Sequence, residues 1–94
     1  MEIDWRLIAL EDLQNIRRYI AQNNPAAAER ISGTIRRSVE RLATLPGLGR
    51  PGRVDGTREL VIPNTPYIVA YTVIDDRVMI LAVIHSARDW PERF

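Results

Sequence analysis

The stretch "YIVAYTVIDDRVMILAVIH", residues 67–85, decides the fold. Its two halves, 67–74 and 77–85, are almost entirely apolar and rich in β-branched residues, a composition typical of strands covered on both faces. Asp75 and Asp76 stand between the halves, and such a short polar break between two apolar runs predicts a tight β-hairpin. We therefore expect these residues to form the central hairpin of an antiparallel sheet.

Two more strands and a loop precede the hairpin. "TRELVI" (57–62) predicts a strand, and the prolines of "PNTP" (63–66) confine that stretch to a connection. "PGLGRPGRVDG" (46–56) has four glycines and two prolines, which predicts a loop and makes it the best candidate for a mobile functional segment. "EIDWRL" (2–7) alternates apolar and charged residues, which predicts a half-buried first strand.

Between the first strand and the loop, apolar residues recur at the period of an α-helix. One helix is expected over about 9–22. A second is expected from Pro25 to about Ala43, with Asn24 as its N-cap. A very short turn joins the two helices, so they should form an antiparallel hairpin. The predicted buried faces are Ala9, Leu13, Ile16 and Ile20 in the first helix, and Ala28, Ile31, Ile35, Val39 and Leu42 in the second.

The order strand, helix, helix, strand, strand, strand predicts an α+β fold in which a helical hairpin covers one face of an antiparallel sheet. The length of 94 residues, 46% of them apolar, suits a single domain over residues 1–94. No apolar run approaches the roughly 20 residues of a membrane-spanning helix. The opening "MEIDWRL" does not resemble a secretory signal, so a cytoplasmic location is expected.

Composition narrows the chemistry further. The chain has no cysteine, which excludes disulfides and thiolate nucleophiles, and it has a single histidine. We therefore expect no metal and no other cofactor. The formal net charge is only +1, and all 13 basic residues are arginines. This modest charge weakens the case for strong non-specific binding to nucleic acid, which requires many phosphate contacts.

His85, the single histidine, ends the last predicted strand and is followed by Arg88 and Asp89. A histidine at the end of a core strand is more often a hydrogen-bonded structural residue than a catalytic base, which would need a partner within hydrogen-bond reach. Strict alternation over 77–85 predicts one face with His85, Met79, Leu81 and Val83, and another with Val78, Ile80, Ala82 and Ile84.

A metal-independent ribonuclease would need clustered bases, acids and cations around the scissile phosphate. Alternation over 57–62 groups Arg58 with Leu60 and Ile62 on the core side, so we expect Arg58 to be partly buried and paired. The sequence fixes no geometry, so enzymatic activity stays open. The residues available for such a site are Arg50, Arg58, Glu59, His85, Arg88 and the three tyrosines.

The chain resembles the RelE/ParE superfamily of toxins from type II toxin–antitoxin systems, and more closely its ParE branch. The resemblance rests on "ALEDLQNIRRYIAQNNPAAAERI" (9–31), "LATLPGLGRPGRVDGTREL" (42–60), "PYIVAYTV" (66–73) and "VMILAVIHSARDWP" (78–91). It covers almost the whole chain, and the predicted element order agrees with the fold of that superfamily.

The resemblance implies a toxin that a cognate antitoxin neutralises in a hetero-oligomer, with an amphipathic C-terminal segment of the antitoxin wrapped around the toxin. ParE-like members are linked to inhibition of DNA gyrase by binding, whereas RelE-like members cut mRNA on the ribosome. An antitoxin-binding remnant with little toxicity is a third possibility. The predicted partner-binding residues are Arg50, Arg53, Arg58, Arg88 and Trp90, and a ribonuclease would use Arg58, His85 and Arg88.

Two departures from the ribonuclease pattern favour the ParE branch. Many ribonuclease members carry an arginine on the central strand three residues before a tyrosine, but Ile68 stands there, before Tyr71. Those members also tend to end in a catalytic tyrosine, whereas this chain has no tyrosine after Tyr71. Because isoleucine cannot stabilise developing charge on a phosphate, we expect inhibition by binding and no catalysis.

Overall fold

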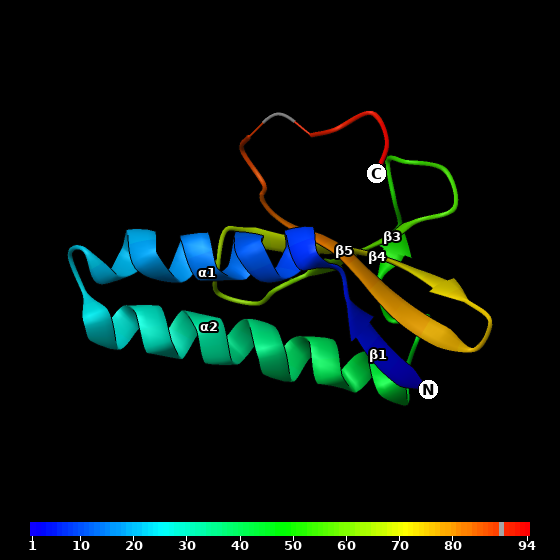
Figure 1. The fold of residues 1–94 in the computed structure, drawn as a ribbon, viewed down its shortest axis with the longest axis horizontal. Helices are drawn as coiled ribbons and strands as arrows, with labels where there is room; N and C mark the ends of the chain where they lie inside the picture. The colour runs from blue at the N-terminus through cyan, green and yellow to red at the C-terminus, as the bar shows by residue number, and fades with distance from the viewer. Residues whose placement is uncertain (89) are drawn as a thin grey trace.

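The structure, a computed structural model, describes residues 1–88 and 90–94 and has the predicted α+β architecture (Figure 1). Two α-helices and a short 3₁₀-helix precede most of the strands. The elements are β1 (Glu2–Trp5), α1 (Leu7–Ala21), α2 (Pro25–Glu40), the 3₁₀-helix (Arg41–Ala43), β2 (Arg50–Pro51), β3 (Arg58–Val61), β4 (Tyr67–Ile74) and β5 (Arg77–His85).

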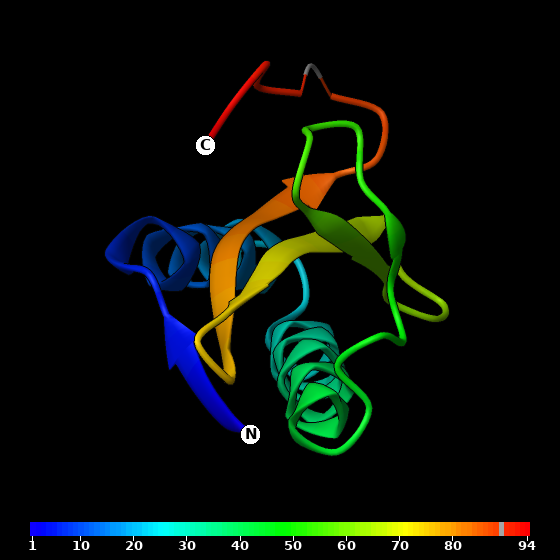
Figure 2. The same ribbon diagram turned by 90° about the vertical axis from the view of Figure 1, so that its right-hand side faces the viewer.

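The five strands form one sheet in the order β1-β5-β4-β3-β2, and the helical hairpin lies on one of its faces (Figure 2). Strand β2 was not expected, because it lies inside the predicted loop 46–56. Its two residues pair with Arg58 and Glu59 of β3 at the sheet edge, where Pro51 needs no amide hydrogen. Strand β1 pairs with β5 in parallel, so the sheet is mostly but not wholly antiparallel.

The central hairpin has the bounds that the sequence predicts. Strands β4 and β5 span residues 67–74 and 77–85, and they pair from Ile74 and Arg77 at the turn to Tyr67 and His85 at the open end. Asp75 and Asp76 both have positive φ angles, 51° and 60°. This left-handed pair matches the right-handed twist of the flanking strands, which is why short hairpins favour it.

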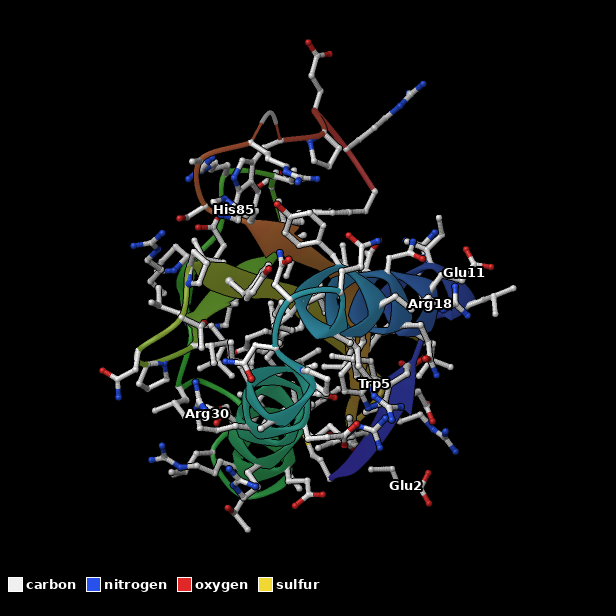
Figure 3. All side chains as sticks on the ribbon, turned by 90° about the vertical axis from the view of Figure 1, so that its left-hand side faces the viewer. Glu2, Trp5, Glu11, Arg18, Arg30 and His85 are labelled. Atoms are coloured by element: carbon white, nitrogen blue, oxygen red, sulfur yellow. The ribbon has the colours of Figure 1, made fainter. Side chains whose placement is uncertain are left out.

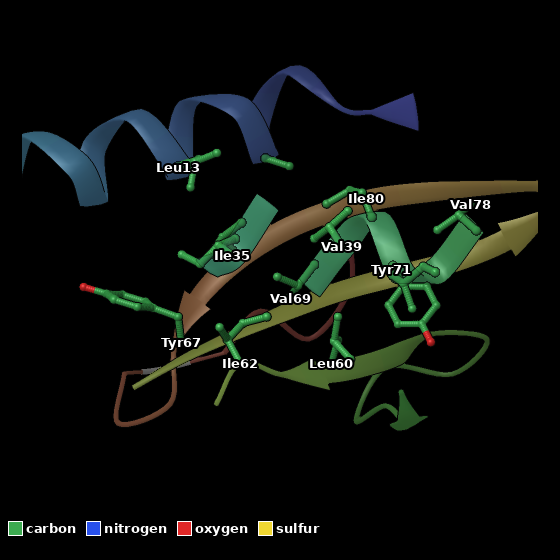
Figure 4. Close-up of a cluster of buried hydrophobic side chains, with 13 residues drawn as sticks. Leu13, Ile35, Val39, Leu60, Ile62, Tyr67, Val69, Tyr71, Val78 and Ile80 are labelled. Carbon is green, nitrogen blue, oxygen red and sulfur yellow. The ribbon is translucent and has the colours of Figure 1, made fainter. Parts of the chain in front are cut away.

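A β-bulge makes the predicted faces of β5 wrong. Tyr71 pairs with Ile80 while the preceding residue, Ala70, pairs with Ala82, so Leu81 has no partner on β4. The extra residue shifts the alternation by one position. Val78 and Ile80 therefore share the core face with Val83 and His85, and Met79 and Leu81 do not. Figure 4 shows Val78 and Ile80 in the core cluster with Val69 and Tyr71.

The helices contribute the apolar faces that their spacing predicts. Ala9, Leu13, Ile35 and Val39 are among the buried core residues. Asn24 caps α2, where its side chain accepts a hydrogen bond of 3.0 Å from the amide of Ala27. No helix in residues 1–88 or 90–94 is long and apolar enough to cross a membrane.

The junction between β1 and α1 lies earlier than predicted. The strand ends at Trp5 and the helix begins at Leu7, so the predicted alternation over 2–7 stops after two apolar residues. Ile3 and Trp5 are partly buried and pack against the core, whereas Leu7 is 71% exposed.

Tyr71 fastens the loop after α2 to the sheet. Its side chain is fully buried, and its hydroxyl donates to the carbonyl of Pro46 and accepts from the amide of Gly49, both at 2.8 Å. Gly49 has no room for a side chain, since an added Cβ would lie 2.7 Å from the Tyr71 ring. One buried hydroxyl therefore satisfies two backbone groups of a loop that has little regular structure of its own.

We predict that Tyr71→Phe lowers the free energy of unfolding by about 1–3 kcal/mol, because it leaves the buried amide of Gly49 without an acceptor. Urea denaturation followed by circular dichroism measures this change. Tyr19→Phe is the matched control, since Tyr19 is 64% exposed and should lose almost nothing. Equal stabilities of the two variants would contradict the role assigned to the Tyr71 hydroxyl.

Candidate partner-binding site

A groove of about 890 Å³ lies between α1, β5 and the C-terminal segment. Residues 82–85 of β5 contribute to its lining, and Ile8 and Ile16 line it from α1. Pro91 and Phe94 of the C-terminal segment contribute apolar surface. The groove also holds two tyrosines and three arginines, namely Tyr19, Tyr67, Arg6, Arg88 and Arg93.

The groove exists because β5 is longer than its parallel neighbour. Pairing with β1 ends where Trp5 meets Ile80, and the amide of Arg6 then bonds to the Ile80 carbonyl at 3.0 Å. Strand β5 continues to His85, and helix α1 runs beside this unpaired edge. Asp12 of α1 accepts a 3.0 Å hydrogen bond from the edge amide of Val83. A carboxylate at this position both satisfies the strand and discourages uncontrolled pairing with another chain.

The environment of Asp12 raises the pKa of its carboxyl group above the ordinary value. Partial burial against β5 is the main cause, because removal from water disfavours the charged form. The hydrogen bond from Val83 lowers the pKa, and the neighbouring charge of Glu11 raises it. The net direction shows that burial outweighs the hydrogen bond.

His85 lies at the end of the groove, beneath the C-terminal segment (Figure 3). Its Nδ1 accepts a 3.1 Å hydrogen bond from the amide of Ala87, and its ring meets Tyr67 edge-on, with 5.6 Å between centroids. The carbonyl of His85 accepts from the amide of Arg88 at 3.1 Å. These contacts shape the turn by which the chain leaves β5. Burial raises the pKa of Tyr67, and the charge of Arg88 opposes that shift.

A second polar cluster lies at the opposite edge of the sheet, around Glu59. This carboxylate is only 3% exposed and accepts from the Arg50 guanidinium at 3.0 Å and from the Arg53 amide at 2.9 Å. The guanidinium of Arg53 lies 4.0 Å above the ring of Trp90. A cation–π contact of this kind contributes about 0.5–2 kcal/mol. The Glu59 cluster thus connects loop 46–56 to the C-terminal segment.

The structure gathers some of the predicted binding residues and separates others. Arg50, Arg53 and Trp90 lie together at the Glu59 cluster, and Arg88 lies in the groove. Arg58 is half-buried on the core side, as its position in the strand predicts. It donates to the carbonyl of Gly49 at 2.8 Å, and no carboxylate among the described residues pairs with it.

The predicted ribonuclease residues do not meet. Arg58 pairs with Tyr71 and His85 pairs with Tyr67, so the two lie on opposite sides of β4 and four residues apart along it. That offset is about 13 Å along the strand and about 10 Å across two strand spacings. Only His85 and Arg88 of the set are neighbours. Among residues 1–88 and 90–94, no three His, Asp or Glu side chains gather as metal ligands. Asp89, which follows His85 and Arg88 in the sequence, lies outside the described residues.

Sequence reasoning missed Asp12 and Tyr19 as groove residues. Ile8, Asp12 and Tyr19 are spaced by four and seven residues, which places them on one stripe of a helix and could have singled them out. The spacing alone does not reveal that this stripe faces an unpaired strand edge, because that depends on how far β1 extends along β5.

Comparison with known proteins gives consistent matches over nearly the whole chain. The family model described as "ParE toxin of type II toxin-antitoxin system, parDE" matches residues 3–90. The putative toxin Y4kP of Sinorhizobium fredii (strain NBRC 101917 / NGR234) is 44% identical over 90 residues, covering 96% of this chain and 93% of that protein. Toxin RelE2 of Caulobacter vibrioides (strain ATCC 19089 / CIP 103742 / CB 15) is 36% identical over 87 residues, covering 93% and 97%.

A solved structure agrees with these relatives. A chain of the chromosomal ParDE TA system from P. aeruginosa superposes with a TM-score of 0.83 at 26% identity, covering 90% of this chain and 95% of that one. Fold and relatives together define the class of protein as a toxin of type II toxin–antitoxin systems. Within that class, the chain belongs to the ParE toxin family.

We predict that Asp12→Asn stabilises the fold at neutral pH and leaves it unchanged in acid. The raised pKa of Asp12 means that the folded protein favours the protonated carboxyl group. This group therefore contributes stability at pH values below its unfolded-state pKa of 3.8. The contribution is lost as the pH rises through the folded-state pKa. Asparagine keeps an acceptor for Val83 and carries no charge, so the difference between variant and wild type should grow with pH.

Urea midpoints at several pH values between 3.5 and 7 measure the effect, with Asp55→Asn, at an exposed loop position, as the matched control. A variant that is less stable than the wild type at pH 7 would show that the charged hydrogen bond to Val83 outweighs burial.

Proposed function

We propose that this chain is a toxin that inhibits DNA gyrase by binding, and that a cognate antitoxin neutralises it by occupying the groove between α1, β5 and the C-terminal segment. Membership of the ParE family supports a toxin of a parDE-type system. The gyrase target follows from the likeness to the ParE branch. The antitoxin partner gains support from the similarity to a chain of the chromosomal ParDE TA system from P. aeruginosa.

The groove suits an extended, amphipathic peptide. Its volume of about 890 Å³ lies at the upper end of the range for binding pockets. The apolar side chains Ile8, Ile16 and Phe94 could receive the apolar face of an antitoxin segment, while Arg88 and Arg93 could pair with its acidic side chains.

The observation that carries the choice of binding over cleavage is the separation of Arg58 from His85 and Arg88. Cleavage of a phosphodiester requires the proton-transfer groups and the charge-stabilising cations to meet around one phosphate. Arg58 is instead bound to the carbonyl of Gly49, and Ile68 on the central strand is 4% exposed and apolar. A partner-directed toxin requires no such convergence.

We predict that Ile8→Ala weakens binding of the antitoxin about tenfold, or 1.4 kcal/mol, because a 52%-exposed apolar side chain at the groove would lose its contact. The probe is the proposed cognate antitoxin, titrated by isothermal calorimetry.

Leu10→Ala is the matched control for this titration, since Leu10 is 44% exposed on the same helix but does not line the groove. Equal affinities for the two variants would place the antitoxin elsewhere on the surface.

The target itself is tested by two parallel assays of the purified toxin. We expect inhibition of supercoiling of relaxed plasmid by purified gyrase, with linear DNA appearing after protease treatment, and no cut transcripts in a reconstituted translation reaction. Toxin mixed beforehand with its antitoxin is the control and should have no effect in either assay.

The name of the C. vibrioides relative, RelE2, motivates a second candidate, a ribosome-dependent mRNA endonuclease. Transcripts cut at codon positions, together with normal supercoiling, would establish that activity and overturn inhibition of gyrase.

A further inference from the structure

A line of arginines runs along the solvent face of α2 and the 3₁₀-helix that continues it. Arg30, Arg37 and Arg41 are all exposed, and their spacings of seven and four residues place them on one helical face. With a rise of 1.5 Å per residue, they extend over roughly 16 Å. We refer to these three residues as the α2 arginine stripe.

Among the described side chains, the stripe has none of the ion pairs that four other arginines form, and in this it resembles Arg18 and Arg36. Arg17, Arg50, Arg53 and Arg77 each lie within 4.0 Å of a carboxylate. Among the described side chains, none forms such an ion pair with the stripe. Nearby Glu29 is held by Arg17 at 2.6 Å. Between residues 30 and 41 the chain has four arginines and one glutamate, a local excess that the net charge of +1 conceals.

Local packing holds the middle arginine of the stripe against the helix. The guanidinium of Arg37 donates to the hydroxyl of Thr34 at 3.4 Å and covers Gly33, where an added Cβ would lie 3.0 Å from Nη1. Glycine inside a helix costs about 1 kcal/mol relative to alanine. Gly33 thus leaves room for the guanidinium of Arg37 to lie along the helix. Apart from the bond to Thr34, its N–H donors have no hydrogen-bond partner among the described residues.

The chemistry of the stripe favours phosphate over a protein surface. A guanidinium presents a planar fork of donors that matches phosphate oxygens in bidentate fashion. Between Arg30 and Arg37, Gly33 and Thr34 offer no large apolar side chain, and protein interfaces usually need such anchors. Arg41, at the end of the stripe, borders a smaller hollow with Leu48 and Val61. Binding to a nucleic acid backbone needs only cations at intervals along the contact.

The stripe is remote from the groove, although Arg17 of α1 contacts Glu29, the neighbour of Arg30. The groove is lined by α1, β5 and segments next to them, and its lining includes no residue of α2. Figure 3 shows Arg18 of α1 and Arg30 of α2 on opposite flanks of the helical hairpin. A nucleic acid on the stripe and a peptide in the groove would therefore use different surfaces.

We propose that the α2 arginine stripe is a phosphate-binding surface that contacts the nucleic acid backbone independently of sequence. This contact goes beyond inhibition of gyrase and does not depend on it. Because three cations neutralise about three phosphates, the logarithm of the affinity for duplex DNA should fall with the logarithm of salt concentration with a slope of about −2.7.

The test measures fluorescence anisotropy of a labelled 20-base-pair duplex between 25 and 200 mM salt, with the full chain alone. The triple variant Arg30→Ala, Arg37→Ala, Arg41→Ala should bind at least tenfold more weakly at 50 mM salt and lose about two to three units of slope. The control variant Arg18→Ala, Arg77→Ala, Arg93→Ala has the same net charge and should keep both affinity and slope.

Equal losses in the two variants would show a bulk charge effect and overturn the proposal, as would the absence of binding by the wild type at 25 mM salt. Unchanged thermal midpoints verify the fold, and if the alanine variant fails to fold, glutamine at the same three positions replaces it. A second duplex of scrambled sequence should bind equally well, and a clear preference between the duplexes would contradict backbone recognition. Because the test contains no gyrase, its result is separate from that of the supercoiling assay.

Discussion

Strand β4 is apolar on both of its faces, and the rest of the structure must cover each of them. Val69 and Tyr71 face the helices and are fully buried, while Ile68 and Ala70 point the other way and are 4% and 0% exposed. The helical hairpin covers the first face, and the loop before β3 and the C-terminal segment lie on the other side (Figure 2). Leaving either face in water would forfeit about 1.5–3 kcal/mol for each large side chain.

The second cover consists of irregular chain, so polar contacts have to hold it in place. Tyr71, on the helix-facing side, bonds to the backbone of Pro46 and Gly49. On the other face, the carboxylate of Glu59 binds Arg50 and Arg53. The ring of Trp90 in turn packs against the guanidinium of Arg53 in a cation–π contact. A buried carboxylate with a single partner would be costly, but here two guanidinium groups and a backbone amide surround it. The cluster predicted as a partner surface is thus already engaged in holding the protein's own segments together.

The surfaces proposed for binding arise where this architecture leaves groups without partners among the described residues. Strand β5 extends beyond the end of β1 and leaves an edge beside α1. The groove at this edge has a lining that is both apolar and cationic. The α2 arginine stripe lies on the solvent face of the other helix. Among the described residues, Arg58 lies apart from His85 and Arg88, so the ribonuclease set predicted from the sequence does not converge on one phosphate.

The sequence by itself determined the elements whose signals are local. The apolar runs of β4 and β5, the Asp75–Asp76 turn and the Asn24 cap depend on neighbours within a few residues, so pattern and turn chemistry were sufficient. The helical faces were also predictable, because an amphipathic helix buries its apolar side wherever it docks. Arg58 was correctly placed on the core side, since β3 contains no irregularity.

Only the tertiary structure decided the features that depend on pairing between distant segments. The bulge at Leu81 reversed the predicted face of half of β5, and strand β2 formed because Glu59 and its neighbours offered an edge to Arg50 and Pro51. Period-2 alternation assumes unbroken register, and register is a property of two strands together. The groove likewise exists because two strands of different length lie side by side. The sequence of one strand does not reveal how far its neighbour extends along it.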